Sequence, residues 1–145
     1  MDAPYFELEE MRSGEIIRLS DFAGKPVMIT FWASWCPDCM RDLPMKEQFY
    51  QHADLNKLGF ITINVTGRER SQEAGKEFTT KHQLPFPVLK DNGRTTYDMY
   101  NCTGVPTTVL LDKEHRIFKV FDDQSSFVDV VGALPQIMQI GRAHV

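Results

Sequence analysis

The sequence is organised around one stretch, Phe31-Trp32-Ala33-Ser34-Trp35-Cys36-Pro37-Asp38-Cys39. An apolar run, Val27–Phe31, leads into it and is typical of a buried strand, because it is short and rich in β-branched and aromatic residues. Apolar residues at helical spacing, among them Met40 and Leu43, follow the second cysteine. The two cysteines therefore stand where a strand ends and a helix begins.

This position has direct consequences for the chemistry of the sulfurs. Unpaired backbone N–H groups and the helix dipole favour negative charge at a helix N-terminus, so Cys36 is expected to form the nucleophilic thiolate readily. Pro37 suits the first helical turn, where its missing N–H would have no partner. Cys39 follows one turn later, within reach of a disulfide to Cys36, and Trp35 is expected to form an apolar wall of the site.

Asp38 lies between the cysteines and has two interpretations. Its carboxylate is expected to disfavour a thiolate at Cys36, which would make the dithiol–disulfide couple more reducing. In the other interpretation, Asp38 faces water and complements the positive end of the helix. The two effects oppose each other, and the sequence leaves both open.

The chain resembles the thioredoxin superfamily and, within it, the TlpA/ResA-type thiol-disulfide oxidoreductases. The segments that carry the resemblance are Leu19-Ser20-Asp21-Phe22, Gly24-Lys25-Pro26-Val27, the stretch 31–39 and Gly104-Val105-Pro106-Thr107-Thr108. The resemblance runs from about residue 3 to about residue 140. It implies a cis peptide bond between Val105 and Pro106, in a loop that lies against the cysteines, keeps metal ions off the thiols and presents the backbone of Val105 to an extended substrate segment.

The chain departs from thioredoxin at one informative position. Thioredoxins carry a buried aspartate six positions before the first cysteine, where this chain has Thr30. The acceptor of the Cys39 proton must then be another residue or water. By resemblance, Glu69 or Glu73, near the end of the strand expected at Gly59–Thr66, is a candidate acceptor, and the alternative is a solvated loop carboxylate.

Alternating strand and helix patterns predict an α/β, thioredoxin-like fold in a single domain over residues 1–145, with a mixed central sheet flanked by helices. An N-terminal β-hairpin and a βα insertion are expected additions. The expected strands or extended segments are 5–8, 16–19, 27–32, 59–66, 84–89, 107–112 and 116–122, and the expected helices are 36–52, 71–81, 95–100 and one capped by Ser125-Ser126. Residues 141–145 are expected to be a disordered or vector-derived tail.

Composition narrows the partners and the location. The 145 residues suit one domain with a buried core, and the net charge of −4 comes without a basic block, so nucleic acid is not an expected partner. The sequence contains no run of about 18 apolar residues, the length that a membrane-spanning helix needs. The resemblance implies an extracytoplasmic protein whose membrane anchor lies outside this sequence, and a cytoplasmic location is the alternative. The chain is expected to be a monomer.

The remaining cysteine and the histidines bear on rival functions. Cys102 is either a third redox thiol or an inert, partly buried residue, and the second interpretation is favoured. A zinc site usually takes four cysteine or histidine ligands, whereas the four histidines of this chain are scattered. A metal site is therefore disfavoured.

These residues predict a thiol-disulfide oxidoreductase without a cofactor beyond the Cys36–Cys39 disulfide. Cys36 would attack a disulfide in a partner protein, Cys39 would resolve the mixed disulfide, and a separate thiol electron donor would restore the dithiol. The resemblance favours the reducing direction and a role in cytochrome c maturation or the cell envelope. Two alternatives stay open: a metal or haem chaperone that binds through the two cysteines, and a thiol peroxidase, although Ala33 stands where a peroxidase usually has threonine.

Overall fold

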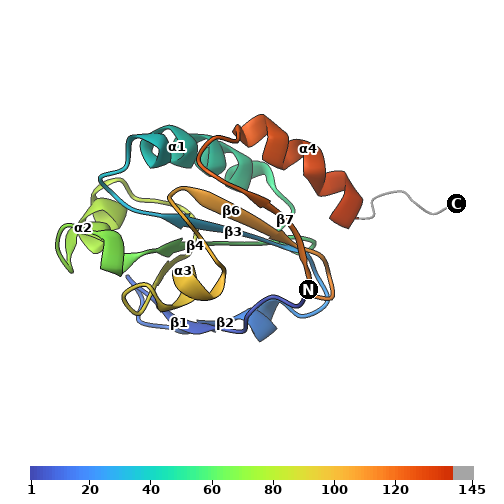
Figure 1. Ribbon diagram of the computed structural model, residues 1–145, viewed down its shortest axis with the longest axis horizontal. Coiled ribbons are helices and arrows are strands. Elements are labelled where there is room, and N and C mark those ends of the chain that lie inside the picture. The colour runs from blue at the N-terminus through green and yellow to red at the C-terminus, as the bar shows by residue number, and fades with distance from the viewer. Residues whose placement is uncertain (139–145) are drawn as a thin grey trace, which may run out of the picture.

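A computed structural model describes residues 1–138 and contains a seven-stranded mixed sheet in the order β2-β1-β5-β4-β3-β6-β7 (Figure 1). The strands are β1 (Glu7–Glu10), β2 (Ile16–Arg18), β3 (Val27–Trp32), β4 (Gly59–Asn64), β5 (Val88–Lys90), β6 (Thr107–Leu111) and β7 (Ile117–Phe121). The helices are α1 (Pro37–His52), α2 (Ala74–Lys81), α3 (Thr95–Met99) and α4 (Phe127–Met138), with 3-10 turns η1 (Leu19–Phe22) and η2 (Thr66–Arg68). The expected α/β class with a mixed sheet is confirmed, and the expected tail at 141–145 lies outside the described residues.

The middle of the sheet is buried on both faces. β3 runs parallel to β4 and antiparallel to β6, and β4 runs parallel to β5. Every residue of β3, β4 and β6 is buried. Strands of this kind need helices on both sides, and their near-continuous apolar sequence is the consequence.

Two neighbouring aromatic residues at the end of β3 show which helix covers which face. The ring of Trp32 packs on Phe78 of α2, with centroids 5.5 Å apart, and the ring of Phe31 packs on Tyr97 of α3 at 6.3 Å. Successive side chains of a strand point to opposite faces, so α2 and α3 cover opposite sides of the sheet. Figure 1 shows α1 and α4 together on the side away from α3.

The N-terminal hairpin is part of the main sheet. β1 pairs with β2, and it also pairs with β5 through the residues Glu9 and Glu10. The carboxylate of Glu10 accepts hydrogen bonds from the backbone N–H groups of Arg12, Ser13 and Val88, at 2.8, 2.9 and 3.1 Å. This single carboxylate therefore holds both the hairpin turn and the neighbouring strand.

Several element boundaries differ from those expected. The largest differences are at β1, which is residues 7–10 instead of 5–8, at β5, which is 88–90 instead of 84–89, and at α2, which begins at Ala74 instead of residue 71; β4 ends at Asn64 instead of residue 66. The glycine in the first turn of α2 has a packing reason, because a Cβ at Gly75 would collide with the side chain of Asn64. The expected cap of α4 is present: the Ser126 hydroxyl accepts from the N–H of Asp129 at 3.3 Å, and the Asp129 carboxylate accepts from the N–H of Ser126 at 3.1 Å.

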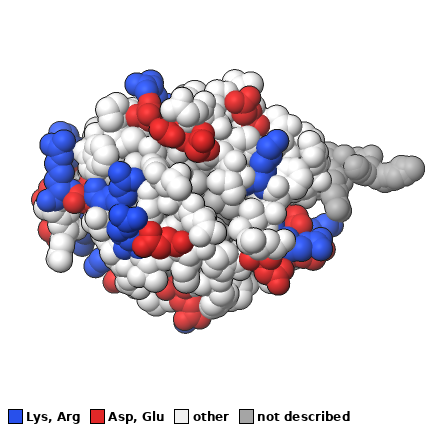
Figure 2. Space-filling model, viewed as in Figure 1, with Lys and Arg blue, Asp and Glu red and all other residues white. Residues whose placement is uncertain are grey.

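The surface carries no large field of one sign on the face that Figure 2 shows, where acidic and basic side chains are interspersed. Within residues 1–138, no helix has the length and apolar character that crossing a membrane requires.

Candidate functional site

The two cysteines occupy the junction of β3 and α1. Cys36 is the N-cap of α1, and its Sγ accepts a hydrogen bond from the backbone N–H of Cys39 at 3.2 Å. Pro37 occupies the first turn, where it deprives the helix of no hydrogen bond. Both thiols are free, Cys36 keeps 4% of its surface exposed, and Cys39 has none. Of the two cysteines, Cys36 alone has any exposed surface.

The loop before β6 lies against the first cysteine. The Val105–Pro106 peptide bond is cis. The Cys36 thiol donates to the carbonyl oxygen of Val105 at 3.4 Å, although the two residues are 69 positions apart in the sequence. Both loop residues are buried, so this loop forms one wall of the site.

The environment of Cys39 disfavours its thiolate. Burial raises the pKa of Cys39 well above its usual value, and the hydrogen bond to Cys36 and the charges of Cys36 and Asp42 raise it further. The Asp42 carboxylate in turn accepts a hydrogen bond from Lys46 Nζ at 2.6 Å. The sequence analysis missed this pair, and the available signal was its spacing of three and seven residues from Cys39 along one helix.

Trp35 directly precedes Cys36 in the chain and keeps 38% of its surface exposed. Its indole N–H donates to the carbonyl oxygen of Arg68 at 2.5 Å. The guanidinium of Arg68 lies 5.8 Å from the Trp35 ring and donates to the Tyr97 hydroxyl at 2.8 Å. Arg68, which the sequence analysis did not single out, therefore holds the indole from η2, the turn that follows β4.

Glu69 anchors the loop that leads into Cys36. Its carboxylate accepts from the backbone N–H of Ser34 at 2.7 Å, from the Ser34 hydroxyl at 2.6 Å and from the side-chain amide of Asn64 at 2.7 Å. These bonds tie the segment after β3 to the end of β4. Glu69 thus accepts three hydrogen bonds that have a structural role. The carboxylate whose charge acts on the pKa of Cys39 is that of Asp42.

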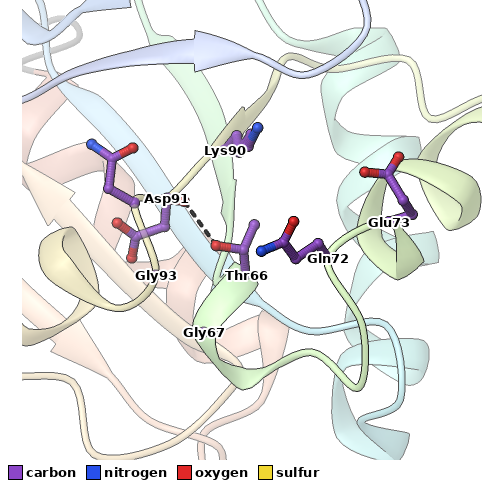
Figure 3. Close-up of a pocket in the computed structure, with 8 residues that line it drawn as sticks. Thr66, Gly67, Gln72, Glu73, Lys90, Asp91 and Gly93 are labelled. Atoms are coloured by element: carbon purple, nitrogen blue, oxygen red, sulfur yellow. Dashed lines mark hydrogen bonds between the residues drawn. The ribbon is translucent and has the colours of Figure 1, made fainter.

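Glu73 lies elsewhere. It is exposed and lines a polar pocket of about 330 Å³ together with Gln72, Thr66 and Lys90. Figure 3 shows Glu73 at the start of α2, on one side of this pocket, and the hydrogen bond from the Thr66 hydroxyl to the Asp91 backbone on the other. Neither active-site cysteine lines the pocket.

Asp38 carries a local counter-charge. Its carboxylate forms an ion pair with Arg41, one helical turn on, and 40% of the side chain is exposed. The arginine offsets part of the repulsion that Asp38 would otherwise exert on a thiolate at Cys36. The water-facing interpretation of Asp38 therefore gains support.

Cys102 lies three residues before Val105 in the sequence. It is half-buried, and burial raises the pKa of its thiol to about 12. A thiol with this pKa is almost entirely protonated at neutral pH and is a poor nucleophile. This environment fits the interpretation of Cys102 as an inert residue.

A groove of about 280 Å³ runs beside the site between α1 and α4. Pro106 lines one end, next to the residue whose carbonyl contacts Cys36. The other lining residues are the apolar Met45, Phe127 and Val128, the acidic Asp38, Asp42 and Asp123, and the polar or basic Ser125, Ser126 and Arg41. In the described part of the chain, no group of three or more histidine, cysteine, aspartate or glutamate side chains is arranged to hold a metal ion.

Comparison with known proteins agrees with this geometry. The model of the family described as AhpC/TSA matches residues 1–120. The thiol-disulfide oxidoreductase ResA of Bacillus subtilis (strain 168) is 34% identical over 119 residues, which cover 82% of this chain and 64% of that protein. ResA of Geobacillus kaustophilus (strain HTA426) is 30% identical over 135 residues, 93% of this chain and 75% of that protein.

Solved structures show the same fold. The crystal structure of the exposed lipoprotein thioredoxin Etrx1 from Streptococcus pneumoniae strain TIGR4 has a TM-score of 0.82 at 28% identity, and the match covers 92% of this chain and 99% of that one. The expected thioredoxin-like fold and the ResA-type resemblance are thereby confirmed. The chain spans 64% of the length of the Bacillus subtilis relative.

Proposed function

This chain belongs to the AhpC/TSA family of thioredoxin-like proteins, and we propose that it is a thiol-disulfide oxidoreductase that reduces disulfides in partner proteins. The observation that carries the proposal is the unequal burial of two free cysteines at one helix N-terminus: Cys36 keeps 4% of its surface exposed and Cys39 keeps none. A pair of this kind can accept a disulfide from outside at the first sulfur and close on itself with the second.

The reaction proceeds in two exchanges. The Cys36 thiolate attacks one sulfur of the partner's disulfide, a mixed disulfide forms, and the partner's other sulfur leaves as a thiolate. Cys39 then loses its proton and attacks Cys36 Sγ, the mixed disulfide breaks, and the reduced partner departs. Asp42, which follows Cys39 by one turn on α1 and whose charge acts on its pKa, is the proposed proton acceptor in place of Glu69 or Glu73.

The partner's polypeptide is proposed to bind along the groove beside Pro106. Its backbone would pair with Val105, and its apolar side chains would contact Met45 and Phe127. A separate thiol donor would then reduce the Cys36–Cys39 disulfide, so no further cofactor takes part in the cycle.

The proposed location is outside the cytoplasm, on a membrane anchor that this sequence does not include, where cell-envelope proteins or apocytochrome c would be partners. Similarity to a lipoprotein thioredoxin described as exposed supports this placement. Digestion of the native protein by external protease in intact cells would support it, and protection until the cytoplasmic membrane is opened would contradict it.

Turnover of insulin disulfides with dithiothreitol as donor tests the activity. Cys36→Ser is expected to abolish turnover, and Cys39→Ser is expected to accumulate a mixed disulfide that dithiothreitol releases. Cys102→Ser is the matched control and is expected to keep the parent's rate, because its thiol is protonated. Full turnover by Cys36→Ser, stoichiometric bound copper without disulfide exchange, or peroxide consumption without a disulfide partner would each overturn the proposal.

A further inference from the structure

A lysine lies completely buried behind the second cysteine. The residues that α1 buries are Cys39, Leu43 and Lys46, and Lys46 has no exposed surface. Such a helical position normally holds an apolar side chain, since lysine is almost never fully buried without a partner. The presence of Lys46 on this stripe therefore requires an explanation.

The ammonium group of Lys46 has two close partners. Nζ donates to the Asp42 carboxylate and to the Thr108 hydroxyl, each at 2.6 Å. The ring of Phe127 from α4 lies 5.9 Å away. Among residues 1–138, the titratable groups that act on Lys46 are Asp42 and Cys39, both on α1, while β6 and α4 contribute the uncharged Thr108 and Phe127.

The lysine and the second cysteine influence each other electrostatically. Burial lowers the pKa of Lys46, while the charges of Asp42 and Cys39 raise it. Interaction between two charges is mutual, so an ammonium that a Cys39 thiolate would stabilise must stabilise that thiolate equally. Solvent screens the interaction between Cys39 and Lys46 little, because both residues are fully buried, while the Asp42 side chain keeps 15% of its surface exposed.

We propose that Lys46 is a positioning residue for the second thiol exchange, acting as the shared counter-ion of the Asp42 carboxylate before proton transfer and of the Cys39 thiolate after it. The inference rests on the proposed function and deepens it. It gives a role to a buried charge that neither the first exchange nor partner binding uses.

The charge balance of the step explains the benefit. The proton passes from Cys39 Sγ to the Asp42 carboxylate, and the negative charge moves from oxygen to sulfur beside the same ammonium. The group of Cys39, Asp42 and Lys46 is neutral before and after the transfer, so no unpaired charge is created in the interior. The Cys39–Cys36 bond then forms, the bond from Cys36 to the partner breaks, and its electron pair leaves on the partner's sulfur. The departing thiolate takes a proton from solvent, to which Asp42 returns its own.

A purely structural ion pair would behave differently. Replacing a buried ion pair by apolar side chains often leaves the stability of a protein unchanged or raises it. If the Asp42–Lys46 pair were only structural, its loss would leave the pH dependence of the second exchange unchanged. The pH profile of the second exchange is therefore the measurement that separates the two roles.

Reduced protein mixed with dithiobisnitrobenzoate in a stopped-flow instrument reports the two exchanges separately. The first coloured thiolate appears at a rate proportional to reagent concentration and reports Cys36, and the second appears at a concentration-independent rate and reports Cys39. All proteins carry Cys102→Ser, so that only the redox pair contributes. Lys46→Met removes the charge at similar volume, and Lys57→Met, at an exposed position, is the control.

In Lys46→Met, the second release is expected to slow about tenfold at neutral pH, with its pH profile displaced upward by about one unit, because an opposite charge nearby typically shifts a pKa by one unit or more. The first release is expected to stay within about twofold of the parent, as are both phases in Lys57→Met. Thr108→Val deletes only the hydroxyl that holds Nζ and is expected to shift the second phase in the same direction by less. This variant keeps the test decisive if Lys46→Met does not fold.

Second-phase pH profiles that coincide with the parent's in the folded variants would overturn the inference, and so would equal slowing of both phases. A parent protein that releases no second equivalent of thiolate would contradict the proposed function instead. The two failures are thus distinguishable.

Discussion

Replacement of Glu69 separates two roles for this carboxylate: an anchor of the active-site loop and the proton acceptor of Cys39. The contacts favour the anchor, because Glu69 accepts two hydrogen bonds from Ser34 and one from Asn64, all between 2.6 and 2.7 Å. Ser34 lies two residues before Cys36, so loss of these bonds is expected to loosen the segment that positions the first sulfur.

The magnitude follows from the donors left behind. In Glu69→Ala, the Ser34 N–H and one hydrogen of the Asn64 amide lose their acceptor, while the Ser34 hydroxyl can rotate toward water. Each unsatisfied buried donor costs about 1–3 kcal/mol, so we expect Glu69→Ala to lower the free energy of unfolding by about 2–6 kcal/mol. Glu69→Gln keeps an acceptor oxygen for both N–H donors and loses the charge, so its expected loss is about 1–3 kcal/mol.

Urea unfolding measures these losses, and the two-phase thiolate release measures the chemistry. Glu73→Gln is the matched control, because Glu73 is exposed and away from the cysteines, and it is expected to change neither quantity. We expect both Glu69 variants to slow the first release more than the second. A Glu69→Gln protein of unchanged stability whose second release is slowed and displaced in pH would refute the anchoring role and make Glu69 the proton acceptor.

Three further predictions concern stability and redox potential. Gly75→Ala is expected to lower the unfolding free energy by about 1–3 kcal/mol in urea, since its Cβ would displace Asn64, and increased stability would contradict this packing. Burial raises the pKa of Glu10, but hydrogen bonds from three backbone N–H groups and from an arginine bring it below its usual value. The ionised Glu10 carboxylate therefore stabilises the fold at pH values above its pKa in the unfolded chain, and this stabilisation is lost as the pH falls through its pKa in the folded protein. Urea titrations across acid pH should therefore show a shallower loss of stability in Glu10→Gln than in the parent, and parallel curves would contradict this. Asp38→Asn is expected to shift the redox potential by less than about 20 mV against glutathione, because Arg41 already offsets the carboxylate and an exposed pair contributes at most about 1 kcal/mol; a larger shift would restore the strong repulsive effect on Cys36.

Features with local causes were predictable from the sequence. Cys36 as N-cap, Pro37 in the first turn and the serine cap of α4 each depend on residues within one helical turn of one another. The buried strands were recognisable for a similar reason, because a strand covered on both faces is apolar along its whole length. The fold class followed from the order of these elements.

The supporting contacts of the site were less accessible to sequence reasoning. Glu69 meets Ser34 across 35 residues, and the Arg68 carbonyl meets Trp35 across 33, through turns after β4 whose geometry the sequence does not specify. The rule that charged side chains face water gave no reason to single out Lys46, whereas the structure pairs it with Asp42 and buries it. A lysine at an apolar helical position, with an acid one turn before it, was the available signal.

The burial of the two cysteines sets the order of the two exchanges in the proposed reaction and explains why the second one would need the Asp42–Lys46 pair. In the proposed reaction, a disulfide of a partner protein meets Cys36 first, since Cys39 has no exposed surface, and the second exchange takes place inside the protein. Burial also makes the Cys39 thiolate hard to form, because it raises the pKa of that thiol. A thioredoxin has a buried aspartate on the central strand as a proton acceptor, but the corresponding residue here, Thr30, has no ionisable group. The proposed acceptor Asp42 and its counter-ion Lys46 lie instead on α1, the helix that carries Cys39, so the geometry of the proposed proton transfer would depend on one turn of helix and not on the packing of helix against sheet.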